Sequence, residues 1–218
     1  MVCVSCRSRL REPTWPRCPR CDYPRGTGRE ATNDCLACRA WPTALQAARC
    51  AVVLSSPASE VVHALKYRGW EGLAGFMGDR MARRLVTDGV FDPRAGGHRA
   101  VVPVPTTERR IRQRGYNQAA LLAERVGVEL SIPVRVGLVR VPSGASQTSL
   151  GAEDRRENVR GVFLPGEVSV EGADVLLVDD VLTTGATAGE AASVLVDAGA
   201  RRVVLLAFAR ALRDGASG

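Results

Sequence analysis

Two adjacent carboxylates followed by a turn of threonines and glycine are the residues of this sequence best suited to chemistry. They stand at the end of an apolar run, and a helical pattern begins directly after the turn. Carboxylates suit sugar hydroxyls, while glycine and the first turn of a helix offer free backbone N–H groups to a phosphate. The sequence thus predicts a site for one sugar phosphate. Its predicted residues are Asp179, Asp180, Thr183, Thr184, Gly185, Ala186 and Thr187.

Two other interpretations of this motif stay open. An Asp-Asp pair after a strand also forms the magnesium and phosphoacceptor site of flavodoxin-like receiver domains, where it belongs near the start of the chain. A Thr-Thr-Gly turn can also be only a helix N-cap. A Walker-type phosphate loop is excluded, because the sequence contains no Gly-Lys-Ser or Gly-Lys-Thr.

A proline-stiffened loop and a cluster of arginines form a second candidate site, for pyrophosphate or a second substrate. Its predicted residues are Thr106, Arg109, Arg112, Arg114, Asn117 and Gln118. Arginine binds phosphate oxygens in bidentate fashion, and four arginines within residues 109–114 repel one another without an anion. The alternatives are a solvated basic helix start for the arginines and a polar first helical turn for Asn117 and Gln118.

Six of the seven cysteines come in CxxC pairs, a spacing typical of zinc sites. The predicted metal ligands are Cys3, Cys6, Cys18, Cys21, Cys35 and Cys38. Six thiolates exceed one four-ligand site and fall two short of two sites, so the spacing leaves the ligand set open. Cys50 lies beside a predicted strand, and we expect a buried core thiol there.

Composition and periodicity predict an α/β fold. The chain is 45% apolar but only 5% aromatic, so its core consists of Val, Leu and Ala, which suits a buried parallel sheet. Apolar spacing predicts strands at residues 51–54, 100–105, 174–178 and 203–208, and helices at 60–67, 73–86, 117–128 and 186–198. A loop is expected at 142–147, followed by a charged helix around 154–158, on which Arg155 and Asn158 either contact ligand or lie exposed. The last strand–helix–strand unit implies a parallel sheet covered on both faces.

The predicted domains are a cysteine-rich module at residues 1–48, an α/β domain at 49–213 and a tail at 214–218. The module lacks apolar periodicity, so metal binding would have to stabilise it. Five of the seven net positive charges lie in residues 1–50, which suits either contact with nucleic-acid phosphates or a solvated surface. We find no membrane-spanning stretch or signal peptide, and we expect a cytoplasmic protein.

The run VLLVDDVLTTGAT resembles the signature of type I phosphoribosyltransferases that binds 5-phosphoribosyl-1-pyrophosphate (PRPP). In that family the two acidic residues bind the ribose 2′- and 3′-hydroxyls, and the loop wraps the 5-phosphate. Carried over, the resemblance assigns the ribose to Asp179 and Asp180, and the phosphate to residues 183–187. It also implies magnesium, bound together with PRPP.

Other motifs resemble the ComF (competence protein F) branch of that fold. These are His63-Ala64-Leu65-Lys66-Tyr67, Val102-Pro103-Val104-Pro105, the arginine cluster with Gly115-Tyr116-Asn117-Gln118, Gln147-Thr148-x-Leu150 and Arg155-Arg156-x-Asn158. With the CxxC head the likeness covers nearly the whole chain, and it implies a zinc ribbon ahead of the phosphoribosyltransferase domain. ComF-type heads have two or four CxxC pairs, and this chain has three. The pairs at 18/21 and 35/38 resemble the later ribbon of the four-pair form, which we favour over 3/6 with 18/21.

The resemblance implies one of two functions. The first is an enzyme that transfers a phosphoribosyl group from PRPP, with release of pyrophosphate, to an acceptor that no motif identifies. The alternative is a non-catalytic accessory protein of DNA uptake that binds PRPP or single-stranded DNA. The basic head favours the second function, and the acidic pair fits both.

Overall fold

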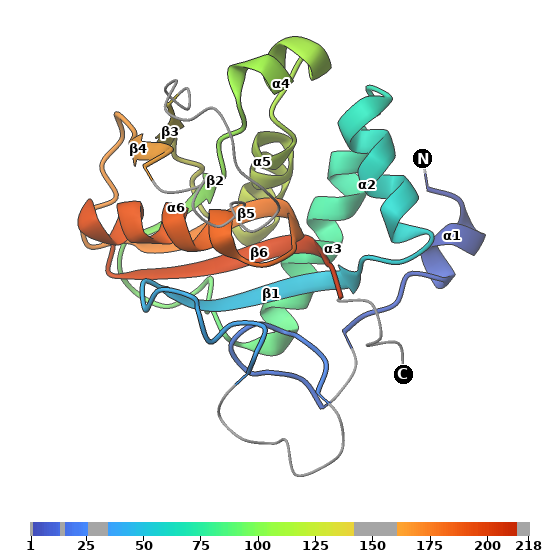
Figure 1. Ribbon diagram of the computed structural model, residues 1–218, viewed down its shortest axis with the longest axis horizontal. Helices are drawn as coiled ribbons and strands as arrows, with labels where there is room; N and C mark the ends of the chain where they lie inside the picture. The colour runs from blue at the N-terminus through green and yellow to red at the C-terminus, as the bar shows by residue number, and fades with distance from the viewer. Residues whose placement is uncertain (1, 14–15, 26–34, 142–160, 213–218) are drawn as a thin grey trace, which may run out of the picture.

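A parallel sheet of four strands, in the order β1-β6-β5-β2, forms the centre of the protein (Figure 1). The computed structural model describes residues 2–13, 16–25, 35–141 and 161–212. The sheet consists of β1 (Leu45–Val53), β2 (Arg99–Pro103), β5 (Asp174–Leu182) and β6 (Arg202–Arg210), and the short β3 (Leu138–Arg140) and β4 (Phe163–Pro165) pair antiparallel. The helices are α1 (Val4–Ser8), α2 (Ala58–Tyr67), α3 (Leu73–Asp88), α4 (Glu108–Arg114), α5 (Gln118–Leu130) and α6 (Ala186–Asp197). The predicted α/β class is confirmed.

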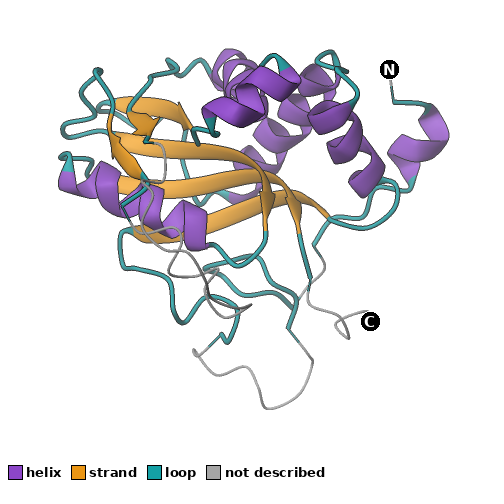
Figure 2. Cartoon of the chain, turned by 45° about the horizontal axis from the view of Figure 1, so that its top comes forward, coloured by secondary structure: helices purple, strands orange, loops and turns teal. Residues whose placement is uncertain are grey.

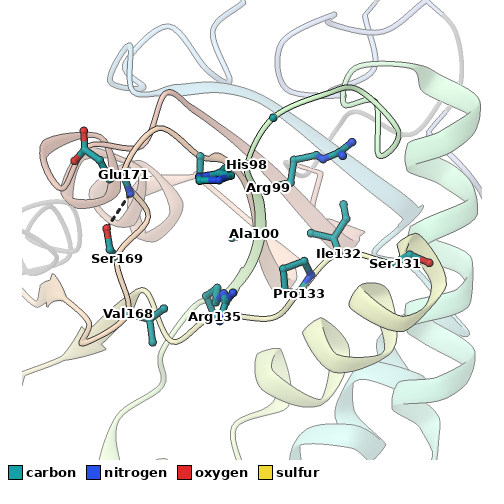
Figure 3. A pocket seen from close by; sticks show the side chains of 12 residues that line it. His98, Arg99, Ala100, Ser131, Ile132, Pro133, Arg135, Val168, Ser169 and Glu171 are labelled. Carbon is teal, nitrogen blue, oxygen red and sulfur yellow. Dashed lines mark hydrogen bonds between the residues drawn. The ribbon is translucent and has the colours of Figure 1, made fainter.

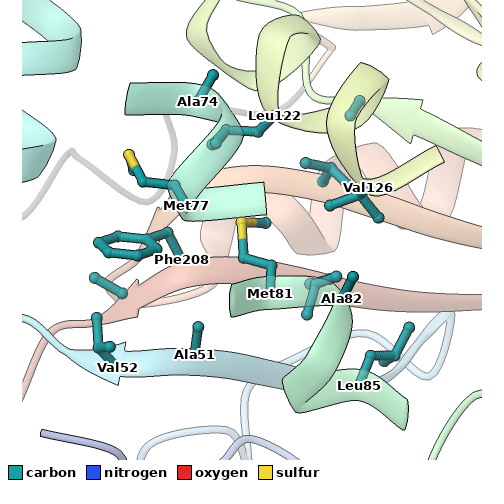
Figure 4. Packing of buried hydrophobic residues seen from close by; sticks show 14 of the residues in the cluster. Ala51, Val52, Ala74, Met77, Met81, Ala82, Leu85, Leu122, Val126 and Phe208 are labelled. Carbon is teal, nitrogen blue, oxygen red and sulfur yellow. The ribbon is translucent and has the colours of Figure 1, made fainter. Parts of the chain in front are cut away.

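Helices cover both faces of the sheet, as predicted (Figure 2). α3 and α5 pack against each other and against one face, while α6 packs against the other. On the first face, Met77, Met81 and Leu85 follow one another at four-residue spacing along α3 and meet Leu122 and Phe208 (Figure 4). Each such side chain, fully buried, contributes about 1.5–3 kcal/mol.

The opposite face carries a second cluster that includes part of the cysteine-rich head. Ala188, Ala191 and Ala192 of α6 are buried there and let the helix lie close to the sheet. Cys18, Cys21, Cys38 and Trp41 belong to the same cluster. The head therefore shares the apolar core of the α/β domain. Cys50 is fully buried in this cluster, which confirms the prediction of a core thiol.

β1 and β5 extend well beyond their predicted bounds, whereas β2 and β6 differ from theirs by at most two residues at either end. β1 begins at Leu45, inside the range predicted for the head, because it pairs with β6 from Leu45 onward. β5 was predicted to end at Val178 but continues to Leu182, since its partner β6 is equally long. Asp179 and Asp180 thus lie within a strand rather than after it. The predicted loop at 142–147 and helix around 154–158, with Arg155 and Asn158, lie outside the described residues.

Candidate functional site

A cleft of about 590 Å³ opens at the carboxyl ends of β1, β2 and β5. Ligands of open α/β sheets bind at this edge. The predicted ligand residues that line the cleft are Thr106, Arg114, Gln118, Asp179, Asp180, Thr183 and Thr187. The structure thus brings both predicted sites, the acidic pair and the arginine segment, to one cavity, although residues 106–118 and 179–187 are far apart in the sequence. We call it the carboxyl-edge cleft.

The two carboxylates occupy opposite sides of β5, because side chains alternate along a strand. Asp180 is buried and forms an ion pair with Lys66 of α2, with 2.8 Å between Nζ and Oδ2. Asp179 accepts a hydrogen bond of 2.8 Å from the backbone N–H of Asp180. Burial and the neighbouring Asp180 charge raise the pKa of Asp179 to about 8, although Lys66 acts in the other direction. Burial thus favours the protonated form of Asp179.

Residues 183–187, which we call the phosphate loop, join the end of β5 to α6. Gly185 adopts φ +83° at the N-cap of α6, a left-handed conformation that favours glycine. The Thr184 hydroxyl accepts a hydrogen bond from the backbone N–H of Ala186 at 3.3 Å. This hydrogen bond closes a turn between residues two apart; the N-cap residue of α6 is Gly185, and no side chain caps the helix. Thr183 and Thr187 instead line the cleft.

Positive side chains from three elements line the cleft opposite the phosphate loop. They are Lys66 of α2, Arg110 and Arg114 of α4, and Arg140 of β3. Arg114 donates a hydrogen bond of 2.8 Å to Gln118 Oε1 and lies 4.9 Å from the centre of the Tyr67 ring. This arrangement of fixed cations suits a ligand with several negative charges.

Sequence reasoning did not assign Lys66, Arg110 or Arg140 to the site. Two signals for Lys66 were available, because it is the chain's only lysine and lies in the run of residues 63–67. Arg110 belongs to the same cluster as the predicted arginines. Which arginines of α4 line the cleft depends on how the helix is rotated about its axis, and the sequence does not give this rotation. No signal marked Arg140, which comes from a three-residue strand.

Other predicted residues do not line the cleft. Arg112 forms an exposed ion pair with Glu108 at 3.2 Å, one helical turn away, and Arg109 is not among the residues that line the cleft. Asn117 caps α5 by accepting a hydrogen bond from the Ala119 N–H at 3.1 Å, and it donates one to the Val104 carbonyl. Asn117 thus supports the loop that carries Thr106 and is not among the residues that line the cleft.

The buried hydroxyl of Thr106 is an unused hydrogen-bonding group at the cleft. Thr106 is 8% exposed, and its Oγ1 has no hydrogen-bond partner in the described part of the chain. Buried polar atoms are normally paired, so a solitary one on a cavity wall is expected where a ligand completes the bond.

The head brings four cysteines together in a group that fits a metal ion. The Sγ atoms of Cys18, Cys21, Cys35 and Cys38 all lie within 4.8 Å of one another. The distance is 3.8 Å from Cys18 to Cys38 and 3.7 Å from Cys21 to Cys35. Four sulfurs at about 2.3 Å from a zinc ion would be about 3.8 Å apart in a tetrahedron.

The chemistry of these thiols also suits a metal. Hydrogen bonding from the Cys21 side chain lowers the pKa of Cys18 to about 4, whereas the same contact raises the pKa of Cys21 and burial raises the pKa of Cys38 to about 12. Among these three thiols, Cys18 is therefore the one most readily ionised to the thiolate that binds metal. Cys3 and Cys6 lie outside this group, at the exposed helix α1. The favoured set of four therefore fits a metal such as zinc, and the first CxxC pair has no place in it.

A buried ion network fastens the head to the α/β domain. Asp22, which follows Cys21, is fully buried and pairs with Arg17 at 2.9 Å and with Arg84 of α3 at 3.2 Å. It also accepts a hydrogen bond of 3.0 Å from the backbone N–H of Cys50. Because buried charges are stable only when paired, this network holds the head in one position on the domain.

A second cleft, of about 740 Å³, lies at the amino ends of β2 and β5 and is called the amino-edge cleft (Figure 3). Its lining side chains include His98, Arg99, Arg135 and Glu171. The backbone N–H of Glu171 donates a hydrogen bond of 3.2 Å to the Ser169 hydroxyl. None of the predicted ligand residues that the structure describes lies there.

The chain resembles curated bacterial proteins along almost its whole length. It is 30% identical over 215 residues to the DNA utilization protein YhgH of Salmonella typhi, covering 97% of this chain and 91% of that protein. It is 30% identical over 205 residues to the competence protein ComFC of Bacillus subtilis, covering 91% of this chain and 79% of that protein. The chain belongs to the ComF family. The competence protein F of Haemophilus influenzae is 37% identical over 118 residues, about half of each chain. No protein-family model matches.

Two solved structures that align with part of this chain are, by their names, phosphoribosyl-handling enzymes. The glutamine PRPP amidotransferase from B. subtilis aligns with a TM-score of 0.41 and 22% identity, over 61% of this chain and 25% of the enzyme. The hypoxanthine phosphoribosyl transferase of Trypanosoma cruzi aligns with a TM-score of 0.38 and 16% identity, over 63% and 64%. This ComF-family chain has a type I phosphoribosyltransferase fold with a small N-terminal cysteine module, as its sheet, signature and cysteine cluster indicate. No helix among the described elements is long and apolar enough to cross a membrane.

Proposed function

We propose that the carboxyl-edge cleft binds PRPP with magnesium and that the protein transfers the phosphoribosyl group to an acceptor. The observation that carries this proposal is the meeting of Asp179 and Asp180, the phosphate loop and several cations in one cleft. Asp179 and Asp180 would accept hydrogen bonds from the ribose hydroxyls. Thr183, Thr187 and the first N–H groups of α6 would bind the 5-phosphate.

The basic wall suits the pyrophosphate of the same molecule. Arg110 and Arg114 and the free Thr106 hydroxyl would bind its oxygens and hold the leaving group in place. In the transfer the bond from ribose C1 to pyrophosphate breaks, pyrophosphate leaves with the electron pair, and C1 forms a bond to the acceptor. Magnesium bound with PRPP would supply charge neutralisation of that leaving group.

Calorimetric titration with PRPP and magnesium tests the binding proposal. Asp179→Asn and Asp180→Asn each remove a charged acceptor, and we expect each to weaken binding about tenfold or more. The matched control is Asp197→Asn, an exposed acid at the far end of α6 that should bind as the parent does. Equal affinity in all four proteins would refute the proposal.

The second candidate is a PRPP- or single-stranded-DNA-binding accessory protein without turnover. The names of the relatives, which are competence and DNA-utilization proteins, and the basic surplus of the head favour it. Pyrophosphate release from PRPP on adding a panel of nucleobases and amines separates the two candidates, since only an enzyme releases it. Gel-shift measurements with single-stranded DNA at low salt test whether the protein binds DNA. The absence of a shift would exclude the DNA-binding alternative.

A further inference from the structure

The back of the phosphate loop lies directly against the cysteine-rich head. The indole N–H of Trp41 donates a hydrogen bond of 2.8 Å to the carbonyl of Thr184. A methyl group on Gly185 would overlap the Trp41 ring, and one on Gly189, in the second turn of α6, would overlap Pro42. Residues 41–42 thus fill the space behind the loop, and the two glycines permit that close approach.

The position of Trp41 depends on the four-cysteine cluster. Its backbone N–H donates to the carbonyl of Cys38 at 3.0 Å. Arg20, between Cys18 and Cys21, donates to the Cys38 carbonyl at 3.3 Å and to the carbonyls of Pro42 and Leu45 at 2.8 and 2.9 Å. A change in how the thiols are held therefore moves the backbone that carries Trp41.

A second contact reaches the same loop from the other CxxC pair. The buried Arg210, the last residue of β6, donates hydrogen bonds to the carbonyls of Leu182 and Thr183. Its guanidinium lies 5.0 Å from the centre of the Tyr23 ring, two residues after Cys21. A cavity of about 130 Å³ is lined by Tyr23 and Ala37 of the head together with Thr183 and Thr184 of the loop. Trp41, which follows Cys38, thus contacts the loop directly, and Tyr23, which follows Cys21, is linked to it through Arg210.

We propose that the metal-loaded head is a clamp that holds the phosphate loop in its binding conformation, with Trp41 and Arg210 as positioning residues. This inference rests on the proposed function, since it assigns a control to the same PRPP site. Pre-organised loops bind more tightly because less order has to be imposed on binding. Coupling between two sites is reciprocal, so zinc should strengthen PRPP binding and PRPP should strengthen zinc binding by one factor, about tenfold.

The test uses the full chain with zinc as the metal and PRPP with magnesium as the ligand. We expect removal of zinc to weaken PRPP binding about tenfold and to speed hydrogen exchange in residues 182–187, with residues 101–103 of the sheet unchanged. Competition with a chromophoric chelator should show zinc affinity rising by the same factor when PRPP is present.

Trp41→Phe keeps an aromatic ring but removes the donor to Thr184. We expect this variant to retain one zinc per chain while losing most of the reciprocal effect, which a merely structural tryptophan would leave intact. Trp70→Phe, at an exposed tryptophan between α2 and α3, is the matched control and should behave as the parent.

Unchanged exchange and unchanged PRPP affinity after zinc removal would overturn the clamp. If the zinc-loaded parent does not bind PRPP, the proposed function fails, and hydrogen exchange in residues 182–187 alone decides the clamp. If zinc removal unfolds the whole chain, the zinc-loaded Trp41→Phe protein decides it: parental PRPP affinity together with parental hydrogen exchange in residues 182–187 of that variant refutes the proposal.

Discussion

The two clefts at opposite edges of the same sheet are both large, yet only one has the composition of a binding site. The amino-edge cleft is the larger, about 740 Å³ against about 590 Å³. The carboxyl-edge cleft alone combines an acidic pair, a helix start and the unpaired Thr106 hydroxyl. The proposed function therefore rests on convergent polar groups, and not on cavity size, in choosing between the two edges of this α/β sheet.

The largest expected effect comes from removing both carboxylates. Asp179→Asn combined with Asp180→Asn should weaken PRPP binding about a hundredfold, because two charged acceptors are lost. The paired change at the other cleft, His98→Asn with Glu171→Gln, should leave the affinity unchanged. Calorimetric titration of both proteins measures the contrast, and a comparable loss in both would remove the distinction between the clefts.

The next largest effect concerns two glycines with positive φ, one near each cleft. Gly185→Ala should lower the free energy of unfolding by about 2 kcal/mol and PRPP affinity about tenfold, since φ is +83° and the methyl group meets Trp41. Gly97→Ala, at φ +101° where an added methyl group would make only an ordinary van der Waals contact with Arg201 at 3.8 Å, should cost about 1 kcal/mol and leave affinity unchanged. Denaturant unfolding and titration separate the two, and equal affinity losses would contradict the account.

A smaller effect is expected from single cations on the cleft walls. Arg114→Met should weaken PRPP binding about fivefold and flatten its salt dependence, because a partly exposed charge contributes about 1 kcal/mol. Arg135→Met changes the same residue type at the amino-edge cleft and should change neither quantity. Calorimetric titration with PRPP at two ionic strengths measures both quantities. If Arg135→Met, and not Arg114→Met, changed the salt dependence, PRPP would be assigned to the amino-edge cleft.

The smallest effect is a pH dependence that belongs to Asp179. Its pKa of about 8 means that ribose hydroxyls meet a carboxylate only after a proton leaves, so PRPP affinity should rise about threefold between about pH 7.5 and about pH 8.5. In the free protein the folded chain keeps this proton longer than the unfolded chain, so Asp179 lowers the free energy of unfolding as pH rises from about 4 to about 8. In Asp179→Asn, neither PRPP affinity nor the free energy of unfolding should keep this dependence on pH. If either quantity still changed with pH in the variant, another titratable group would be responsible.

The sequence was informative about the sheet because its strands are buried on both sides. The continuous apolar residues before Asp179, and the βαβ pattern after them, specify a central parallel strand without help from other parts of the chain. The extent of β5 was underestimated because two adjacent acids read as the end of a strand. Pairing with β6 continues past them, and local sequence carries no signal for the length of a partner strand.

The candidate site was predictable where it is continuous in sequence and not where it is assembled in space. Asp179, Thr183 and Thr187 form one motif and line one cleft. Lys66 and Arg140 reach that cleft from a separate helix and a short strand, so their role depends on tertiary packing. The contact of Trp41 with the loop joins residues 143 positions apart, which no spacing rule could reveal.

The most direct measurement is a crystal structure of the zinc-loaded protein with PRPP and magnesium. The account predicts density in the carboxyl-edge cleft, with both ribose hydroxyls within hydrogen-bonding distance of Asp179 and Asp180 and the 5-phosphate on residues 183–187. Density for PRPP in the amino-edge cleft, or an empty carboxyl-edge cleft at saturating ligand, would contradict it.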